Sequence, residues 1–264
     1  MKKIIWFLPL LLLTACSSDS GQGAGKGETN AEINAPNTCS LVLLDKSISI
    51  NPNDAYIRQK YQQALTALIS ENIKRKGDRL EVYFIHDNTT KAKALERMCQ
   101  SEKEDVSSAN QTDAEAAETS FEVSLQKERA RFQREAIAQL AAPNPSSSNR
   151  YTDILASLPV ANRLAERGFR VKTYYFSDMI ESMRGTNRRD FHTTPPVRSE
   201  QATSWARQDA KRLKSTLPNL AEVEFYQILP FKPTASSKTN NPNVTVYWET
   251  LFQELGVTKR LEEL

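Results

Sequence analysis

Short apolar runs alternate with longer segments of helical periodicity from about residue 40 to residue 255, and this alternation constrains the fold more than any other feature. Runs suited to strands lie at 40–44, 80–85, 171–176 and 223–229. Continuous apolar character is typical of strands that are covered on both faces. Helical spacing predicts helices at 52–74, 113–142, 152–167, 200–214 and 244–255. This order predicts an α/β fold with a doubly wound, mostly parallel central sheet and helices on both faces.

The amino terminus has the pattern of a secretory signal. Lys2 and Lys3 precede an apolar run at 4–13, which is too short for a spanning helix. Leu13-Thr14-Ala15-Cys16 then resembles a bacterial lipobox, which implies a signal peptide at 1–15 and a lipidated Cys16. Acyl chains hold such a protein in the membrane at roughly 0.8 kcal/mol per buried CH2. We therefore expect an extracytoplasmic lipoprotein of the bacterial cell envelope that faces the periplasm or the cell surface.

Two further expectations concern the sorting and the tether of this lipoprotein. Ser17 and Ser18 after the cysteine resemble outer-membrane sorting more than retention in the inner membrane. Residues 16–37 are mostly small, polar or charged, so they offer little to bury and predict a flexible tether. The remaining 38–264 are long enough for one α/β domain with its own core.

Charge and cysteine content limit the partners and the redox chemistry. The formal net charge is +3, and loss of Lys2 and Lys3 leaves it near neutral, so we expect no nucleic acid partner. Cys39 and Cys99 would lie in an oxidising compartment and could pair. A bridge closing about 60 residues would stabilise the fold by ~4 kcal/mol in the chain-entropy model. Two separate buried thiols are the alternative.

A candidate cation site follows the first strand. Asp45-Lys46-Ser47-Ile48-Ser49 offers one carboxylate and two hydroxyls, which are the oxygen ligands that Mg2+ prefers. Such a stretch can also be only a turn. Asp178 lies just past the strand at 171–176, and parallel pairing would place it at the same edge of the sheet as Asp45, which we call the rim. Thr152 precedes Asp153 and has the character of a helix N-cap.

These residues together resemble the metal-ion-dependent adhesion site of von Willebrand factor A domains, over roughly residues 39–257. The matching residues are Asp45, Ser47, Ser49, Thr152 and Asp178. The resemblance implies that the two serines and the threonine bind the ion directly or through water, while the aspartates act largely through water. One coordination position would stay open for the carboxylate of a protein ligand with an exposed Asp or Glu. The implied ion is Mg2+, with Mn2+ or Ca2+ as alternatives, and these five residues include no His or Cys that would select zinc.

Two stretches leave their interpretation open. Residues 91–99 fit either an antiparallel edge strand or a short helix. Residues 101–148 are longer than the usual connection in that family and predict a helical insertion. This insertion could pack on the sheet as a helix hairpin, or it could shade the site or form a partner surface.

The leading hypothesis is a binding module without turnover that captures a protein partner through a divalent metal. The alternatives are a metal-independent scaffold in an envelope or mobile-element apparatus, and a metal-assisted phosphoester hydrolase, for which no general base stands out. Asp87 either joins the rim or lies in a surface turn. His86 and His192 are the only histidines, and neither lies in a nucleophile-elbow pattern, which argues against a Ser/His/Asp hydrolase. The basic residues Arg184, Arg188 and Arg189 could meet acidic groups or form a solvated loop.

Overall fold

The computed structural model describes residues 35–51, 53–146 and 148–264. The predicted signal peptide, Cys16 and nearly all of the predicted tether lie outside these ranges. Residues 36–264 form one compact unit. Among the described residues, no helix combines the length and the apolar character that crossing a membrane requires.

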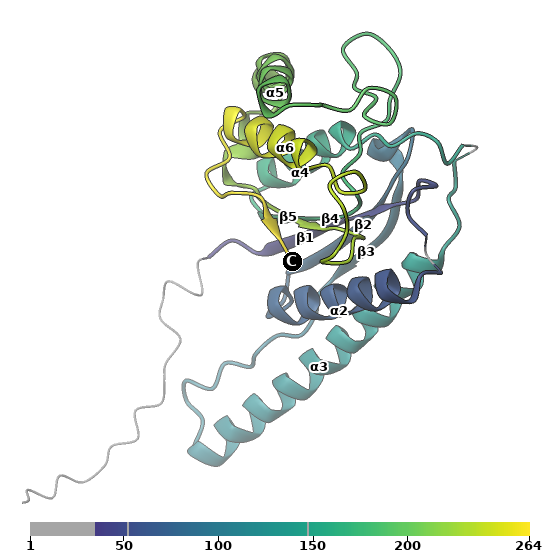
Figure 1. The fold of residues 1–264 in the computed structure, drawn as a ribbon. Helices are drawn as coiled ribbons and strands as arrows, with labels where there is room; N and C mark the ends of the chain where they lie inside the picture. The colour runs from purple at the N-terminus through teal and green to yellow at the C-terminus, as the bar shows by residue number, and fades with distance from the viewer. Residues whose placement is uncertain (1–34, 52, 147) are drawn as a thin grey trace, which may run out of the picture. The chain divides into compact units, whose positions relative to one another are not determined.

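The centre of the fold is a sheet of six strands in the order β3-β2-β1-β4-β5-β6 (Figure 1). The strands are β1 Thr38–Asp45, β2 Arg79–Ile85, β3 Lys93–Met98, β4 Arg170–Phe176, β5 Glu224–Ile228 and β6 Glu262–Glu263. Only β3 runs antiparallel to its neighbour. Leu44 of β1 aligns with Phe84 of β2 and with Phe176 of β4. The residues that follow these three strands therefore leave the sheet at the same edge.

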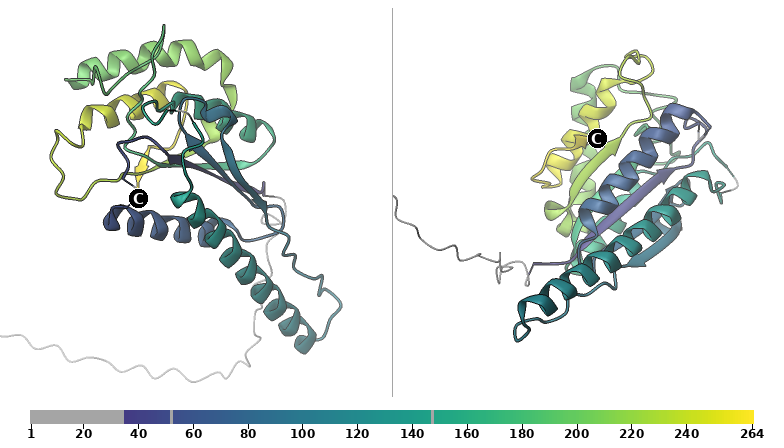
Figure 2. Two further views of the ribbon diagram at one scale, coloured as in Figure 1. Left: turned by 90° about the vertical axis from the view of Figure 1, so that its right-hand side faces the viewer. Right: turned by 90° about the horizontal axis from the view of Figure 1, so that it is seen from below.

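Helices cover both faces of the sheet, as Figure 2 shows. They are α2 Ala55–Asn72, α3 Gln111–Ala141, α4 Leu158–Glu166, α5 Ser199–Leu213 and α6 Pro242–Glu254. Successive side chains of a strand point to opposite faces. Val42 and Leu44 accordingly pack in one core with α2 and α3, while Leu41 and Leu43 pack in another core with α4, α5 and α6. The predicted doubly wound α/β fold is confirmed.

The structure also decides the two open stretches. Residues 93–98 are an antiparallel edge strand. The insertion is one helix of 31 residues, α3, rather than a hairpin. Its apolar residues Leu125, Phe132 and Ala136 are buried beside α2 and the sheet, whereas most of the helix surface is exposed. The short strand β6 was not predicted from the sequence.

The proposed disulfide between Cys39 and Cys99 is wrong in this structure, where both are free, buried thiols. Cys39 belongs to the core on the α4–α6 face, whereas Cys99 belongs to the core on the α2–α3 face. The sheet separates the two side chains, so a bridge would require one strand to turn over. Burial, together with the neighbouring Glu128, raises the pKa of the Cys99 thiol to about 12, and the thiol donates a hydrogen bond to that carboxylate at 3.1 Å.

We predict that a fragment of residues 36–264 carries two alkylatable thiols after unfolding without reductant, and almost none while folded, because both are buried and protonated. Mass spectrometry after iodoacetamide treatment measures this. An unfolded fragment that takes up no label until a reductant is added would show that Cys39 and Cys99 are paired in a disulfide.

Candidate metal site at the carboxyl edge of the sheet

Asp45 ends β1 and is 6% exposed, with both carboxylate oxygens engaged. Oδ1 accepts a hydrogen bond from the Ser47 backbone N–H at 2.8 Å, and Oδ2 accepts one from the Ser177 hydroxyl at 2.6 Å. The first bond forms the turn that presents the following serines. The second ties the end of β1 to the end of β4. The Asp45 carboxylate therefore fixes the backbone at this edge of the sheet and also contributes a negative charge there.

The two serines of the motif lie together at this rim. Their Oγ atoms are 2.9 Å apart, and Ser47 is buried while Ser49 is exposed. The Ser49 side chain also lies near the Asp178 carboxylate, whose pKa it acts to lower. Contacts thus join four of the five predicted residues, Asp45, Ser47, Ser49 and Asp178, in one place at the edge between β1 and β4.

A left-handed residue holds Asp178 in position. Met179 has φ of 60°, a conformation that is costly for a residue with a side chain and that persists only where neighbours hold it. Trp248 of α6 supplies this restraint, since its indole N–H donates to the Met179 carbonyl at 2.8 Å. The Asp178 carboxylate accepts from the Ile180 N–H at 3.0 Å. Sequence reasoning missed both Met179 and Trp248, and no local pattern marks them.

The two aspartates oppose each other's ionisation. Burial and the charge of Asp178 raise the pKa of Asp45 to about 7. Burial also raises the pKa of Asp178. Tyr61 of α2 is buried beside them, and its pKa is raised by burial and then by both carboxylates. A cation at this rim would remove the repulsion between the two carboxylates.

Thr152 does not cap a helix as predicted. Its backbone pairs with Ser182, through N–H to carbonyl distances of 3.2 and 2.9 Å, so the chain is still extended there. The helical segment begins with a 3-10 turn at Leu155–Ser157. The Ile154 and Leu155 N–H groups donate to the Glu181 carboxylate, at 2.7 and 3.1 Å, instead of to Thr152. This leaves the Thr152 hydroxyl free for another role.

That hydroxyl is the observation that best fits a cation at this edge. Thr152 is 1% exposed, and within the described ranges its Oγ1 has no hydrogen-bond partner. A buried hydroxyl left in this state costs about 1–3 kcal/mol. The Thr152 backbone pairs with Ser182, four residues after Asp178, which places it at the carboxyl edge of the sheet, although no hydrogen bond among the described residues joins it to the other four motif residues. Hydroxyl and carboxylate oxygens are the ligands that a hard cation prefers. The residues present therefore fit the Mg2+ that the resemblance implies.

A buried ion-pair cluster holds the Thr152 segment. Arg188 bonds to Asp153 and, at 2.7 Å, to Glu181. Burial, with the charge of Asp153, raises the pKa of Glu181 to about 8, and the Arg188 guanidinium opposes this shift. Arg189 pairs with Asp209 at 2.7 Å. Arg188 and Arg189 thus form ion pairs within the domain and are neither a binding patch nor a solvated loop. Of the three arginines, only Arg184 is exposed.

Lys46, the second residue of the motif, joins the site to the insertion. Its Nζ donates to three carbonyls at the end of α3, those of Gln139, Leu140 and Ala142, at 2.7, 3.0 and 2.8 Å. The last carbonyls of a helix lack partners within the helix and carry partial negative charge. The last turn of α3 has no basic residue of its own. A cation about 93 residues earlier in the chain therefore caps this helix.

Other candidate groups do not join the site. Asp87 lies in a turn, where it accepts from the Ser146 hydroxyl at 2.8 Å and lies 3.0 Å from the His86 ring. No group of three or more His, Cys, Asp and Glu side chains in the described parts of the chain is placed to hold a metal. An ion at the rim would therefore depend on hydroxyl ligands beside the two aspartates.

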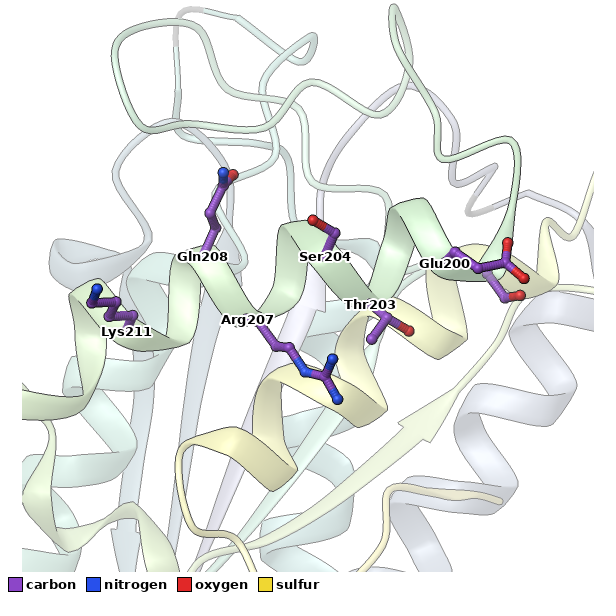
Figure 3. Close-up of a pocket in the computed structure, with 7 residues that line it drawn as sticks. Glu200, Thr203, Ser204, Arg207, Gln208 and Lys211 are labelled. Atoms are coloured by element: carbon purple, nitrogen blue, oxygen red, sulfur yellow. The ribbon is translucent and has the colours of Figure 1, made fainter.

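A hollow of about 560 Å3 on α5 offers no convergent chemistry. Figure 3 shows its labelled side chains spread along the helix and pointing in different directions. Arg207, one of them, pairs with Glu254 of α6 at 3.1 Å. We assign no site there.

Comparisons with known proteins do not name a family. No family model matches the chain, and no curated protein matches it. Among solved structures, proximal thread matrix protein 1 from the mussel byssus aligns with 87% of this chain at 10% sequence identity and a TM-score of 0.37. The match covers 44% of that protein, so the chain spans less than half its length. A likeness at this level carries no argument about function.

We predict that Lys46→Met lowers the free energy of unfolding by about 2 kcal/mol, because three carbonyls at the end of α3 lose a charged donor. Urea denaturation followed by circular dichroism measures the change. Lys91→Met, at an exposed lysine near the same edge, is the matched control. Equal stability of the two variants would show that Lys46 does not hold the insertion.

We predict that the metal-free protein loses stability as the pH rises from about 4 to about 7. Asp45 ionises near 4 when unfolded but at about 7 when folded, so the folded state binds the extra proton in this window. Urea denaturation in EDTA across this range measures the slope. Asp45→Asn should reduce the slope, and the part that comes from Asp178 and Glu181, whose pKa values are also raised, should remain. An unchanged slope in that variant would contradict the assignment.

Proposed function

We propose that this domain binds a protein partner through a divalent cation at the rim formed by β1, β4 and the Thr152 segment. Ser47, Ser49 and Thr152 would hold the ion, with Asp45 and Asp178 supporting them. The observation that carries the proposal is the buried, unpartnered hydroxyl of Thr152 at the edge where two buried carboxylates repel each other. The five-residue resemblance to the von Willebrand factor A adhesion site supports it.

The donor set favours capture of an anion. Neutral hydroxyls leave the charge of Mg2+ partly uncompensated, and Mg2+ commonly keeps positions for water or ligand oxygens. When bound, the ion would supply an electrophilic position for a carboxylate of the partner. Ser49 is exposed, so this edge is open to a macromolecule. An exposed Asp or Glu of a protein partner fits such a site.

The same contacts favour binding over turnover. A metal-assisted hydrolase needs a base that can take a proton from water. Asp45 accepts hydrogen bonds at both oxygens, and Asp178 accepts one from the Ile180 N–H. Asp87 is held by Ser146 in its turn. These carboxylates therefore have structural partners, and we propose a module without catalytic activity.

We further propose that the domain works outside the cytoplasm on a lipid anchor. The support is the sequence alone, in the basic start, the apolar run and Leu13-Thr14-Ala15-Cys16. Bacterial cell envelope location follows from this pattern, with the outer membrane favoured by Ser17 and Ser18.

We predict that Mg2+ binds residues 36–264 with one site and that Thr152→Val weakens this binding at least about tenfold, the loss expected from one ligand. Asp45→Ala should abolish it. Isothermal titration calorimetry measures both, and Mn2+ and Ca2+ are titrated in parallel to identify the preferred ion. Thr66→Val, at an exposed threonine of α2, is the control and should titrate like the wild type.

Titrations that are the same for all four proteins would contradict the metal site. Partner capture from membranes by the intact lipoprotein, with and without EDTA, then separates the metal-dependent module from a metal-independent scaffold. Capture that survives both EDTA and Asp45→Ala would support the scaffold.

A further inference from the structure

A cavity of about 650 Å3 lies beside the candidate metal site, between the start of α2 and the end of α3. Its walls are mainly apolar and include Leu44, Ile50, Ile57, Ile137, Leu140 and Phe176. Asp45, Ser47 and Ile48 of the motif also line it. The cavity therefore shares a wall with the cation site, and one ligand can reach both.

One polar group inside the cavity lacks a partner. Tyr61 lines the cavity and is 5% exposed, yet among the described residues its hydroxyl makes no hydrogen bond. Its ring packs edge-on against Phe176 at a centroid distance of 5.1 Å, so the phenol cannot swing out to water without breaking this contact. An apolar pocket with one convergent polar group is typical of a ligand site.

The surroundings of the cavity favour an acidic ligand with an apolar side chain. Arg58 of α2 is exposed at the lining and carries a positive charge. Ile48 is 71% exposed between the two motif serines, so it would contact a ligand that binds at this edge. Lys46 also lines the cavity and is a second cation, with its Nζ bound to carbonyls at the end of α3. Charge complementarity thus selects a carboxylate, and the walls select a large apolar neighbour.

We propose that this cavity is a specificity pocket, which takes a large aliphatic or aromatic side chain next to the carboxylate of a partner polypeptide. The inference rests on the proposed function, because the cation is what would hold that carboxylate. It adds what the cation alone cannot provide, since a metal site would accept any exposed Asp or Glu. The insertion makes the pocket, because α3 supplies one of its walls.

The test uses a positional-scanning library of acetylated hexapeptides with one fixed Glu, presented to immobilised residues 36–264 in Mg2+. A second library has a fixed Asp. We expect large apolar residues to be enriched roughly tenfold over Ala at one position adjacent to the acid, which is the gain from burying one such side chain. Absence of any such preference, in a protein that binds Mg2+ by calorimetry, would overturn the pocket and leave the cation site standing.

A cavity-filling variant provides the control. Ala138 lines the cavity from an exposed position on α3, so Ala138→Trp should fill the space without a change in the core. Ala130→Trp, at an exposed position of α3 outside the cavity, is matched to it. We expect Ala138→Trp to lose the apolar preference and to keep Mg2+ binding, while Ala130→Trp keeps both. Retention of the preference in Ala138→Trp would overturn the proposal.

Two further results separate the pocket from the metal and from other occupants. Enrichment of apolar residues that persists in EDTA would support the pocket and contradict the role of the cation in holding the neighbouring carboxylate. Self-association measured by sedimentation that is lost in Ala138→Trp but not in Ala130→Trp would assign the cavity to a second copy of the chain. Binding of residues 36–264 to lipid vesicles that is lost in the same way would assign it to a lipid. Either result would overturn the peptide assignment.

Discussion

Two buried carboxylates at one edge of the sheet, Asp45 and Asp178, govern the rest of the site. They stand at adjacent strand ends because β1 and β4 pair in parallel with Leu44 beside Phe176. Their proximity in a poorly hydrated place raises the pKa of Asp45 to about 7. A fold keeps such an arrangement at a cost in stability, and a bound cation would offset that cost. The unpartnered Thr152 hydroxyl is a second cost that the same cation would offset.

The elements around the rim hold these groups in place. Trp248 restrains the left-handed Met179 next to Asp178, and Glu181 with Arg188 fixes the segment that carries Thr152. Lys46 binds the end of α3 from within the motif itself. The insertion is therefore joined to the loop of the candidate metal site through the Lys46 side chain, and removal of this side chain would release both. This links a helix that is largely exposed to solvent with the site that we propose for the partner.

Apolar periodicity was enough to predict strands β1, β2, β4 and β5, the five α-helices and the parallel sheet, because each core face leaves a local pattern in the chain. The meeting of Asp45 and Asp178 also followed, since parallel strands share a carboxyl edge. Interactions between distant residues could not be predicted. The start of the helix after Thr152 depends on Ser182 and Glu181, and the separation of Cys39 from Cys99 depends on which face the edge strand presents. The only trace in the sequence of the contact between Lys46 and the end of α3 is indirect: the last turn of α3 has no basic residue.

The central claim is that one cation binds among Ser47, Ser49 and Thr152, and a crystal structure of residues 36–264 soaked in Mn2+ tests it most directly. We predict a single strong anomalous peak at this edge of the sheet, about 2.1 Å from hydroxyl oxygens of these residues. We also predict that the peak is lost in Thr152→Val crystals. A wild-type crystal with no anomalous density at the rim, or with density only elsewhere, would contradict the claim.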